Sequence, residues 1–253
     1  MVYKKDIETA PPGTPSPPPM KEPTTNSVVG GVAIDAEVTN GADSDIDAGI
    51  ELIVDWATEK FGRQQLISAK EEFFWRTGKV FYDDEFFARR MDYFIDFFLF
   101  QRLLEGKHPD HSGYTPFEAW RRLYGEERDA IVTGARHSVY RIQRINQKAL
   151  AVQDLLEKER IQILPRRGES FSGVAKKDLF QGFIYETGAG WYLSRGIFFH
   201  PTEAWRPIRR QIKWEKLRQG GDRIRLLSHL AKLQVQQMRH RHLDCKSIYS
   251  RRP

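Results

Sequence analysis

Residues 73–100 read FFWRTGKVFYDDEFFARRMDYFIDFFLF and hold 12 of the 31 aromatic residues of this 253-residue chain. After Asp83 and Asp84, either of which suits a helix start, two neighbouring apolar stripes recur at helical spacing: Phe87, Met91, Phe94 and Phe98 in one, Tyr93, Phe97, Phe100 and Leu104 in the other. Two adjoining stripes are typical of a helix that is buried on most of its sides. We therefore expect this helix to form the centre of a helical core.

Two helices and a Pro-rich arm are predicted before this segment. An apolar pattern capped at Ser44 or Asp45 predicts a helix through Phe61, and a second helix spans residues 63–76. Seven of the 13 prolines fall within the first 23 residues, so residues 1–44 are predicted to form a disordered arm. Such an arm suits a plain spacer or a ligand for an SH3-type groove.

Two further helices are predicted after the aromatic segment. Thr115, Pro116 and Glu118 form a capping box with a proline in the first turn, which predicts a helix that ends near Gly125. A short helix is expected over residues 126–135.

The hydrophobic period changes to two after Ser138, as it does in half-buried strands. Alternating segments surround residues 140–142, 150–152 and 161–163, and residues 180–186 and 191–199 form a predicted hairpin. Five short strands within about 60 residues predict a small, strongly curved antiparallel sheet or barrel of the SH3-like or OB-like kind.

The chain is expected to return to helix after His200. Pro207 is expected to kink or restart that helix, and a last helix is predicted from Asp222 to about Leu243, after Gly220-Gly221. The predicted fold class is therefore α+β, with four parts: a disordered arm (1–44), an aromatic-rich helical domain (45–136), a small β-barrel-like module (137–200) and a basic helical extension (201–253).

Four segments read FLFQRLL (98–104), YTPFEAW (114–120), RHSVYRI (136–142) and AVQDLL (151–156). This succession resembles uncharacterised bacterial proteins that place helices before a small β-module. The resemblance implies the same architecture and a bacterial, cytoplasmic origin. It implies no activity, cofactor or catalytic residue.

The composition limits the class of protein. Cys245 is the sole cysteine, which excludes an intramolecular disulfide or a multi-cysteine metal site and favours a reducing, cytoplasmic compartment. No apolar run approaches the roughly 18 residues of a membrane helix, and no secretory signal is visible. We expect no membrane span.

Glu85, Arg89, Asp92 and Asp96 share one face of the predicted aromatic helix. Paired carboxylates one turn apart suit acid–base chemistry or a divalent ion. A solvated face on which Arg89 pairs with its acidic neighbours is the simpler interpretation, because no histidine completes a ligand set.

A second polar cluster lies in the loop before Gly113. Glu105 and His108 match the spacing of a helical di-metal motif, and His108, Asp110 and His111 crowd the same loop. A glycine and a proline in this segment end the helix that the motif requires. We interpret the cluster as a polar turn rather than a zinc site.

The remaining candidates for chemistry have simple structural interpretations. Cys245 follows basic residues at 240–242, which would lower its thiol pKa, but a ragged C-terminal segment gives it no fixed base. Gly188-Ala-Gly190 opens a strand rather than a helix, so we interpret it as a turn and not a dinucleotide loop. His137 and His200 are predicted to be core or capping residues. We expect no enzymatic activity and no cofactor or metal.

The net charge of +6 is distributed unevenly along the chain. Residues 201–253 carry 14 Lys and Arg against four Asp and Glu, a charge of +10, whereas residues 1–200 carry −4. This asymmetry favours an anionic partner, which would be nucleic acid, a membrane surface or an acidic protein. A membrane surface is disfavoured because the basic helices have no large aliphatic face left after packing.

Two basic helices in residues 201–253 carry the candidate binding residues. Guanidinium groups bind phosphates, and an indole stacks on an unpaired base. The predicted nucleic-acid-binding residues are Arg206, Arg209, Arg210, Lys213, Trp214, Lys216, Arg225, Lys232 and Arg239. We predict a non-catalytic protein that binds RNA or DNA; the alternative is a protein-interaction adaptor whose basic helices bind an acidic partner. Pairing with the acidic body is open as well, although the +10 exceeds the −4.

Overall fold

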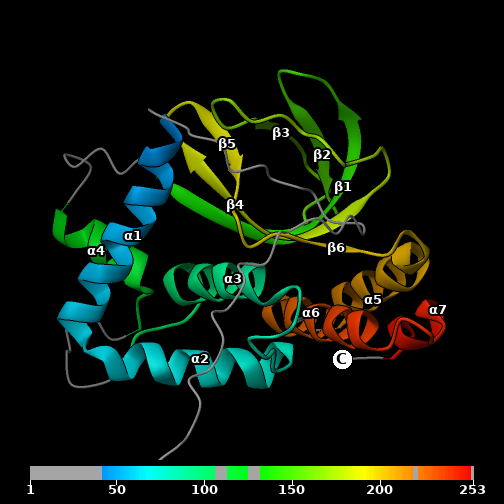
Figure 1. Cartoon of the computed structure of the whole chain (residues 1–253), viewed down its shortest axis with the longest axis horizontal. Helices are drawn as coiled ribbons and strands as arrows, with labels where there is room; N and C mark the ends of the chain where they lie inside the picture. The colour runs from blue at the N-terminus through cyan, green and yellow to red at the C-terminus, as the bar shows by residue number, and fades with distance from the viewer. Residues whose placement is uncertain (1–41, 106–112, 125–131, 219–221, 252–253) are drawn as a thin grey trace, which may run out of the picture. The chain divides into compact units, whose positions relative to one another are not determined.

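The computed structural model describes residues 42–105, 113–124, 132–218 and 222–251 (Figure 1). Within these residues the chain forms seven α-helices, six β-strands and one 3₁₀ turn. In chain order they are α1 (Ala42–Phe61), α2 (Arg63–Thr77), α3 (Phe87–Phe100), α4 (Pro116–Tyr124), β1 (Gly134–Ile145), β2 (Leu150–Asp154), β3 (Arg160–Leu164), β4 (Leu179–Thr187), β5 (Gly190–Leu193), β6 (Phe198–His200), η1 (Thr202–Ala204), α5 (Trp205–Leu217), α6 (Arg223–Arg239) and α7 (Cys245–Tyr249).

Some predictions fall on parts of the chain that lie outside the described residues. These are the Pro-rich arm up to residue 41, the histidine-containing loop at 106–112, most of the helix expected over 126–135, and Gly220-Gly221.

Local sequence signals placed several helices correctly. α1 and α2 cover the two predicted segments, but α1 begins at Ala42, so Ser44 and Asp45 lie within the helix and do not cap it, and the predicted arm is shorter than 1–44. α2 is followed by Gly78, whose φ of +90° suits glycine. At the start of α4, the backbone N–H of Thr115 donates to Glu118 Oε2 (2.8 Å), and the N–H of Glu118 donates to Thr115 Oγ1 (3.2 Å). The predicted capping box is therefore confirmed.

The aromatic helix α3 begins at Phe87, later than predicted. Asp84 does not cap it, because the Asp84 carboxylate accepts the backbone N–H of Phe81 (2.8 Å) and closes a turn before the helix. A short polar side chain thus stabilised a local turn instead of the expected helix start.

Helix α3 is the centre of the helical core, as its two apolar stripes predicted. Phe73 of α2 packs its ring against Tyr93, Phe94 and Phe97 of α3 at centroid distances of 5.4–5.6 Å. α1, α4 and α6 contribute further buried side chains to the same cluster. Burial of each Phe side chain contributes about 1.5–3 kcal/mol to stability.

A buried arginine joins three helices at this core. Arg90 of α3 is 1 % exposed, and its Nη2 donates to the carbonyl oxygens of Thr77 in α2 (3.1 Å) and Ala231 in α6 (2.8 Å). Its guanidinium also lies over the rings of Tyr93 and Phe198. Burial lowers the pKa of Arg90 to about 10, so the group stays cationic at neutral pH.

Five of the strands close a small barrel in the order β1-β2-β3-β5-β4, with β4 returning to β1 and β6 extending β4. The predicted α+β class and small barrel are confirmed. The barrel is mixed rather than antiparallel, because β3 and β5 pair in parallel through Ile163–Trp191 and Leu164–Tyr192. This closed arrangement removes free sheet edges among these five strands.

Two strand boundaries differ from the predictions. β1 starts at Gly134 and pairs with Glu186 of β4, so residues 134–135 are strand and not the end of a helix. The segment predicted as one strand over residues 191–199 divides into β5 and β6. Gly196 lies between these two strands.

Helix α3 lies between the barrel and α2 (Figure 1), and side chains of two barrel-side strands pack in its hydrophobic cluster. Phe183 and Tyr185 of β4 and Phe198 of β6 pack in the same cluster as α3. Gly196 makes this approach possible: a Cβ there would lie 2.5 Å from the Tyr93 backbone. The β-module is therefore held directly against the aromatic helix.

The C-terminal part is more ordered than predicted. The last predicted helix ends at Arg239, and a separate short helix, α7, follows it. Ile248 and Tyr249 of α7 are 2 % and 0 % exposed and pack in a cluster with α5 and α6. Cys245 therefore starts a docked helix and does not lie in a ragged tail. Pro207 lies in the first turn of α5, which restarts the helix after η1.

Candidate nucleic-acid interface

Helix α5 directs its cations to one side because its apolar residues fix the other side. Ile208 and Ile212 are 0 % and 6 % exposed and pack in the cluster that includes Leu226 and Leu230 of α6. Arg209 and Lys213 follow these isoleucines in sequence and are exposed. The amphipathic pattern therefore places the cations on the outer surface of a docked helix.

A groove with a volume of about 620 Å³ lies between α5 and the barrel. The α5 side presents Trp205, Arg209, Lys213 and Lys216. The barrel side presents Arg141 of β1, Gln153 of β2, and Lys158 in the turn between β2 and β3. The groove therefore combines three of the predicted binding residues with two cations from a different part of the chain.

Arg141 and Lys158 are not among the residues predicted from the sequence. Each is a lone cation in the β-module, and only the closure of the barrel brings them opposite α5. Lysine gives no sequence signal for a left-handed backbone conformation, yet Lys158 adopts one, with φ of +64°. Such a conformation is unusual for a residue with a side chain.

Trp205 forms an aromatic surface inside this groove. The Arg141 guanidinium lies over its ring at 4.3 Å from the centroid, and the Arg209 guanidinium lies at 5.9 Å. Trp205 is partly exposed in the groove and is not among the predicted binding residues. Stacking on an indole orients both guanidinium groups and leaves their N–H donors free for an anion.

The groove has a strongly positive lining. Its five cations face a single lining carboxylate, Asp154, which is 0 % exposed. Asp154 Oδ1 accepts from Ser138 Oγ (2.5 Å) and from the backbone N–H groups of Leu156 (2.8 Å) and Glu157 (3.1 Å). Because this carboxylate is held by interior donors, it leaves the cations of the groove without a paired acid.

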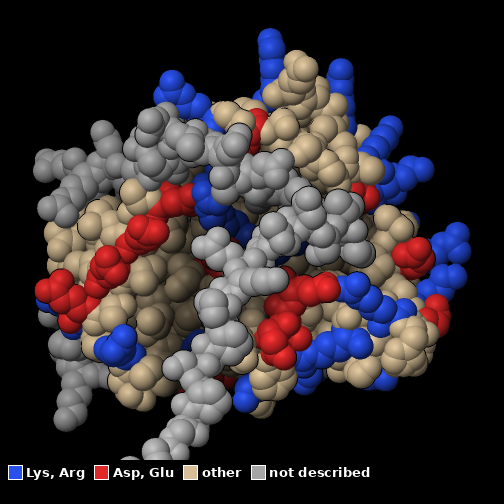
Figure 2. All heavy atoms as spheres, viewed as in Figure 1, with Lys and Arg blue, Asp and Glu red and all other residues tan. Residues whose placement is uncertain are grey.

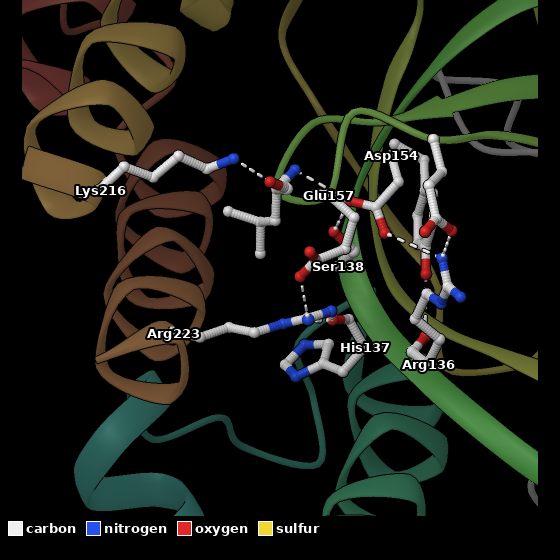
Figure 3. Close-up of polar contacts among 10 residues, drawn as sticks. Arg136, His137, Ser138, Asp154, Glu157, Lys216 and Arg223 are labelled. Carbon is white, nitrogen blue, oxygen red and sulfur yellow. Dashed lines mark hydrogen bonds and ion pairs between the residues drawn. The ribbon is translucent and has the colours of Figure 1, made fainter. Parts of the chain in front are cut away.

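Polar contacts join the α5–α6 region to the barrel at one end of the groove (Figure 3). The ammonium group of Lys216 donates a hydrogen bond to the Leu156 carbonyl oxygen. Arg223 of α6 pairs with Glu157 (2.7 Å) and also donates to the His137 carbonyl oxygen. Lys216 therefore fixes the position of α5 relative to the barrel as well as contributing charge.

The other predicted binding residues lie outside the groove. Arg206 and Arg210 are exposed on α5, and Trp214 lies against Arg218 with 4.7 Å between guanidinium and ring centroid. On α6, Arg225 and Lys232 are exposed, while Arg239 pairs with Asp84 (2.6 Å). Arg241 likewise pairs with Glu85 (2.8 Å). Part of the basic extension is thus paired with the acidic body.

Acidic side chains form a stripe on one part of the surface, and basic side chains predominate on another (Figure 2). In Figure 2, Asp and Glu side chains follow α1, and Lys and Arg side chains gather on the side of α5. A hollow beside α1 is lined by Asp47, Glu51, Asp55 and Asp92. This hollow carries surface carboxylates, whereas the groove beside α5 carries five cations.

The carboxylate stripe of α3 is not a solvated face, which corrects our interpretation. Asp96 is 1 % exposed and accepts hydrogen bonds from the hydroxyl groups of Tyr185 and Ser194. Burial raises the pKa of Asp96 to about 7, against the opposing effect of these two donors. Glu85 lies before the helix and pairs with Arg241 instead of Arg89.

The remaining candidates from the sequence are Cys245, the glycine turn and the metal-ligating side chains. Burial raises the pKa of the Cys245 thiol to about 11, which is opposite to the lowering that its basic neighbours suggested. Gly188 lies in the turn between β4 and β5, as interpreted. Among the described residues, no group of three or more His, Cys, Asp or Glu side chains could hold a metal ion.

His137 and His200 are packed histidines, as predicted. His137 stacks on Phe183 at 4.3 Å, and His200 is 4 % exposed against Phe198 and Tyr249. Burial lowers the pKa of both imidazoles, to about 3 for His200.

The described helices include none with the length and apolar character needed to cross a membrane. No family model, no curated protein and no solved structure matches the chain.

Proposed function

We propose that the protein binds the phosphate backbone of RNA or DNA, without catalysis, in the groove between α5 and the barrel. The supporting observation is the composition of that groove: five cations from two separate parts of the chain converge there, and its one carboxylate is buried and hydrogen-bonded inside. Solvation of a surface helix alone does not explain why its cations lie opposite cations of the barrel.

The geometry suits a single strand more than a compact anion. Arg141 and Lys158 line one wall of the groove, and Arg209 and Lys213 line the other. These four side chains make no hydrogen bond or ion pair with the residues that the structure describes. Successive phosphates of a strand would therefore meet available donors on both walls.

The salt dependence of binding is the direct test. We expect a fluorescein-labelled single-stranded oligonucleotide to bind with an affinity that falls with salt, with a log–log slope of about −3 if four cations each contact a phosphate. Fluorescence anisotropy over a salt series measures this slope for RNA and for DNA. A slope near zero, or no binding at micromolar protein, contradicts the proposal.

The second candidate is a protein-interaction adaptor, which two exposed aromatic side chains support. Trp75 of α2 and Tyr82 are 76 % and 87 % exposed. Large exposed aromatics are common at the centres of protein interfaces. In this case a partner would remain bound after nuclease treatment and would be lost with Trp75→Ser.

For the compartment, we propose the cytoplasm, on the basis of the single, partly buried thiol of Cys245.

A further inference from the structure

A separate cavity of about 190 Å³ lies at one end of the barrel, beneath the connection between β3 and β4. Its apolar floor is formed by Ile142, Leu150 and Phe180, which are buried core residues of the barrel. Phe171 and Val174 of the connection and Phe199 of β6 form its partly exposed walls. The cavity is thus an apolar chamber continuous with the barrel core.

The connection over residues 165–178 explains why this chamber is not filled. It contains no helix or strand, and its large apolar side chains are limited to Phe171 and Val174. Most neighbouring positions in it are glycine, serine or charged residues. Because protein interiors are otherwise close-packed, a chamber of this size leaves its lining without dispersion contacts that an apolar ligand would supply.

Three arginines line the same chamber, and they differ in what they bind. Arg166 and Arg195 are both paired with Asp47, at 2.9 Å and 2.5 Å, and Arg166 also donates to the Leu193 carbonyl oxygen. Arg89 of α3 makes no hydrogen bond or ion pair with the described residues. Arg89 is half-buried. This burial lowers the pKa of its guanidinium, and the negative charge of Asp92 acts in the opposite direction.

A half-buried guanidinium without a hydrogen-bonded partner is an anion site by its chemistry, since desolvation strengthens its attraction for a carboxylate. The chamber beside it matches one ring in size, because a cavity of about 150 Å³ holds benzene. Glu169 also lines the chamber and Asp92 lies near Arg89, so a singly charged anion is favoured over a doubly charged phosphate.

We propose that this chamber binds a small amphipathic monocarboxylate, with its single ring or short branched chain in the barrel end and its carboxylate paired with Arg89. The site is distinct from the groove beside α5, with which it shares no lining residue. A test of ligand binding in the chamber is therefore independent of nucleic-acid binding in the groove.

Calorimetric titration of the full chain with benzoate, and with its neutral analogue benzamide, tests the proposal. Benzoate is expected to bind with a dissociation constant of about 1 mM, which suits nine heavy atoms, and benzamide about tenfold more weakly. Arg89→Gln should reduce benzoate binding to the level of benzamide and leave benzamide unchanged. Arg167→Gln, an exposed arginine of the same connection that does not line the chamber, is the matched control and should change neither.

Val174→Trp fills the chamber from the connection between β3 and β4 and should abolish binding of both compounds. If it fails to fold, the Arg89→Gln result stands alone, because that side chain is partly exposed and makes no hydrogen bond with described residues. Equal affinity for benzoate and benzamide, no binding of either at about 10 mM, or unchanged benzoate binding in Arg89→Gln would overturn the proposal.

Discussion

The Tyr249 hydroxyl lies 2.8 Å from Nδ1 of His200 and so joins the last helix to the barrel. Both side chains are buried, at 0 % and 4 % exposure. The other imidazole nitrogen, Nε2, faces Gln181 Oε1 of β4 at 3.2 Å. Because an amide oxygen only accepts, Nε2 carries the proton and Nδ1 accepts from Tyr249.

The same polarity continues across the core to α3. Gln181 Nε2 donates to the Leu227 carbonyl oxygen (2.8 Å) and to Tyr93 Oη (3.2 Å). Tyr93 in turn donates to His137 Nε2 (2.8 Å), whose Nδ1 donates to Gln101 Oε1 (2.9 Å). With both imidazoles neutral, each shared atom in this chain has a consistent donor or acceptor role and both tyrosine hydroxyls have an acceptor, which agrees with the lowered pKa values of the two histidines.

Tyr249→Phe should therefore destabilise the protein without changing its shape. The substitution leaves the buried Nδ1 of His200 without a donor, which costs about 1–2 kcal/mol. Urea denaturation of the variant and the parent measures the difference in the free energy of unfolding. Equal stability of the two proteins would show that the chain of hydrogen bonds does not hold α7 in place.

Asp96→Asn should remove a pH dependence of stability. The pKa of Asp96 in the folded protein, about 7, is above its value in the unfolded chain, so folding favours the protonated form. Stability from this group is present at low pH and is lost as pH rises from about 4 to 7.

The Asn variant, which is always neutral, should gain about 2–4 kcal/mol relative to the parent over this range. Denaturation of both proteins at pH 4 and pH 8 gives this difference. A difference that does not change with pH would mean that Asp96 is ionised normally in the folded protein.

Gly196→Ala should separate the barrel from α3. The new methyl group would lie 2.5 Å from the Tyr93 backbone, so either the strand connection or the helix must move. We expect a loss of about 3 kcal/mol, at the upper end of overpacking effects. Gly188→Ala is the matched control, since a Cβ there meets no atom within 4 Å, and it should be nearly neutral by thermal denaturation.

Lys158→Gly should raise stability while lowering affinity for an oligonucleotide. Glycine adopts the φ of +64° at this turn without strain, which contributes about 1 kcal/mol. Loss of the ammonium removes one phosphate contact and should reduce the slope of log affinity against log salt by about 1. A variant that is more stable and binds as well as the parent would place Lys158 outside the binding site.

The predictable parts of this protein are those that local sequence determines. Thr115 and Glu118 cap α4 through contacts three residues apart, and the stripes of α3 follow its own period. The prediction for Asp84 was wrong because its carboxylate can either cap a helix or close a turn, and the position of the Phe81 N–H decides between the two. The parallel pairing of β3 with β5 depends on barrel closure, which no local pattern encodes.

Only the α5 side of the candidate groove could be predicted from the sequence. The period of α5 identified Arg209, Lys213 and Lys216 as outward cations. Arg141 and Lys158 are isolated cations in sequence. They precede the start of α5 by 64 and 47 residues, so only the fold brings them to the groove. Asp96 is a case in which the sequence pattern predicted a solvent-exposed carboxylate. Tertiary packing buries this side chain instead.

The central claim is that the groove, and not the bulk charge of residues 201–253, binds nucleic acid. Two double variants of α5 separate these alternatives, because each reverses two cations on the same helix: Arg209→Glu with Lys213→Glu inside the groove, and Arg206→Glu with Arg210→Glu outside it. Anisotropy with one labelled oligonucleotide at fixed salt compares them. We predict that the first pair lowers affinity by at least about tenfold and the second by less than about threefold; equal losses from the two pairs, or no loss from the first, would contradict the claim.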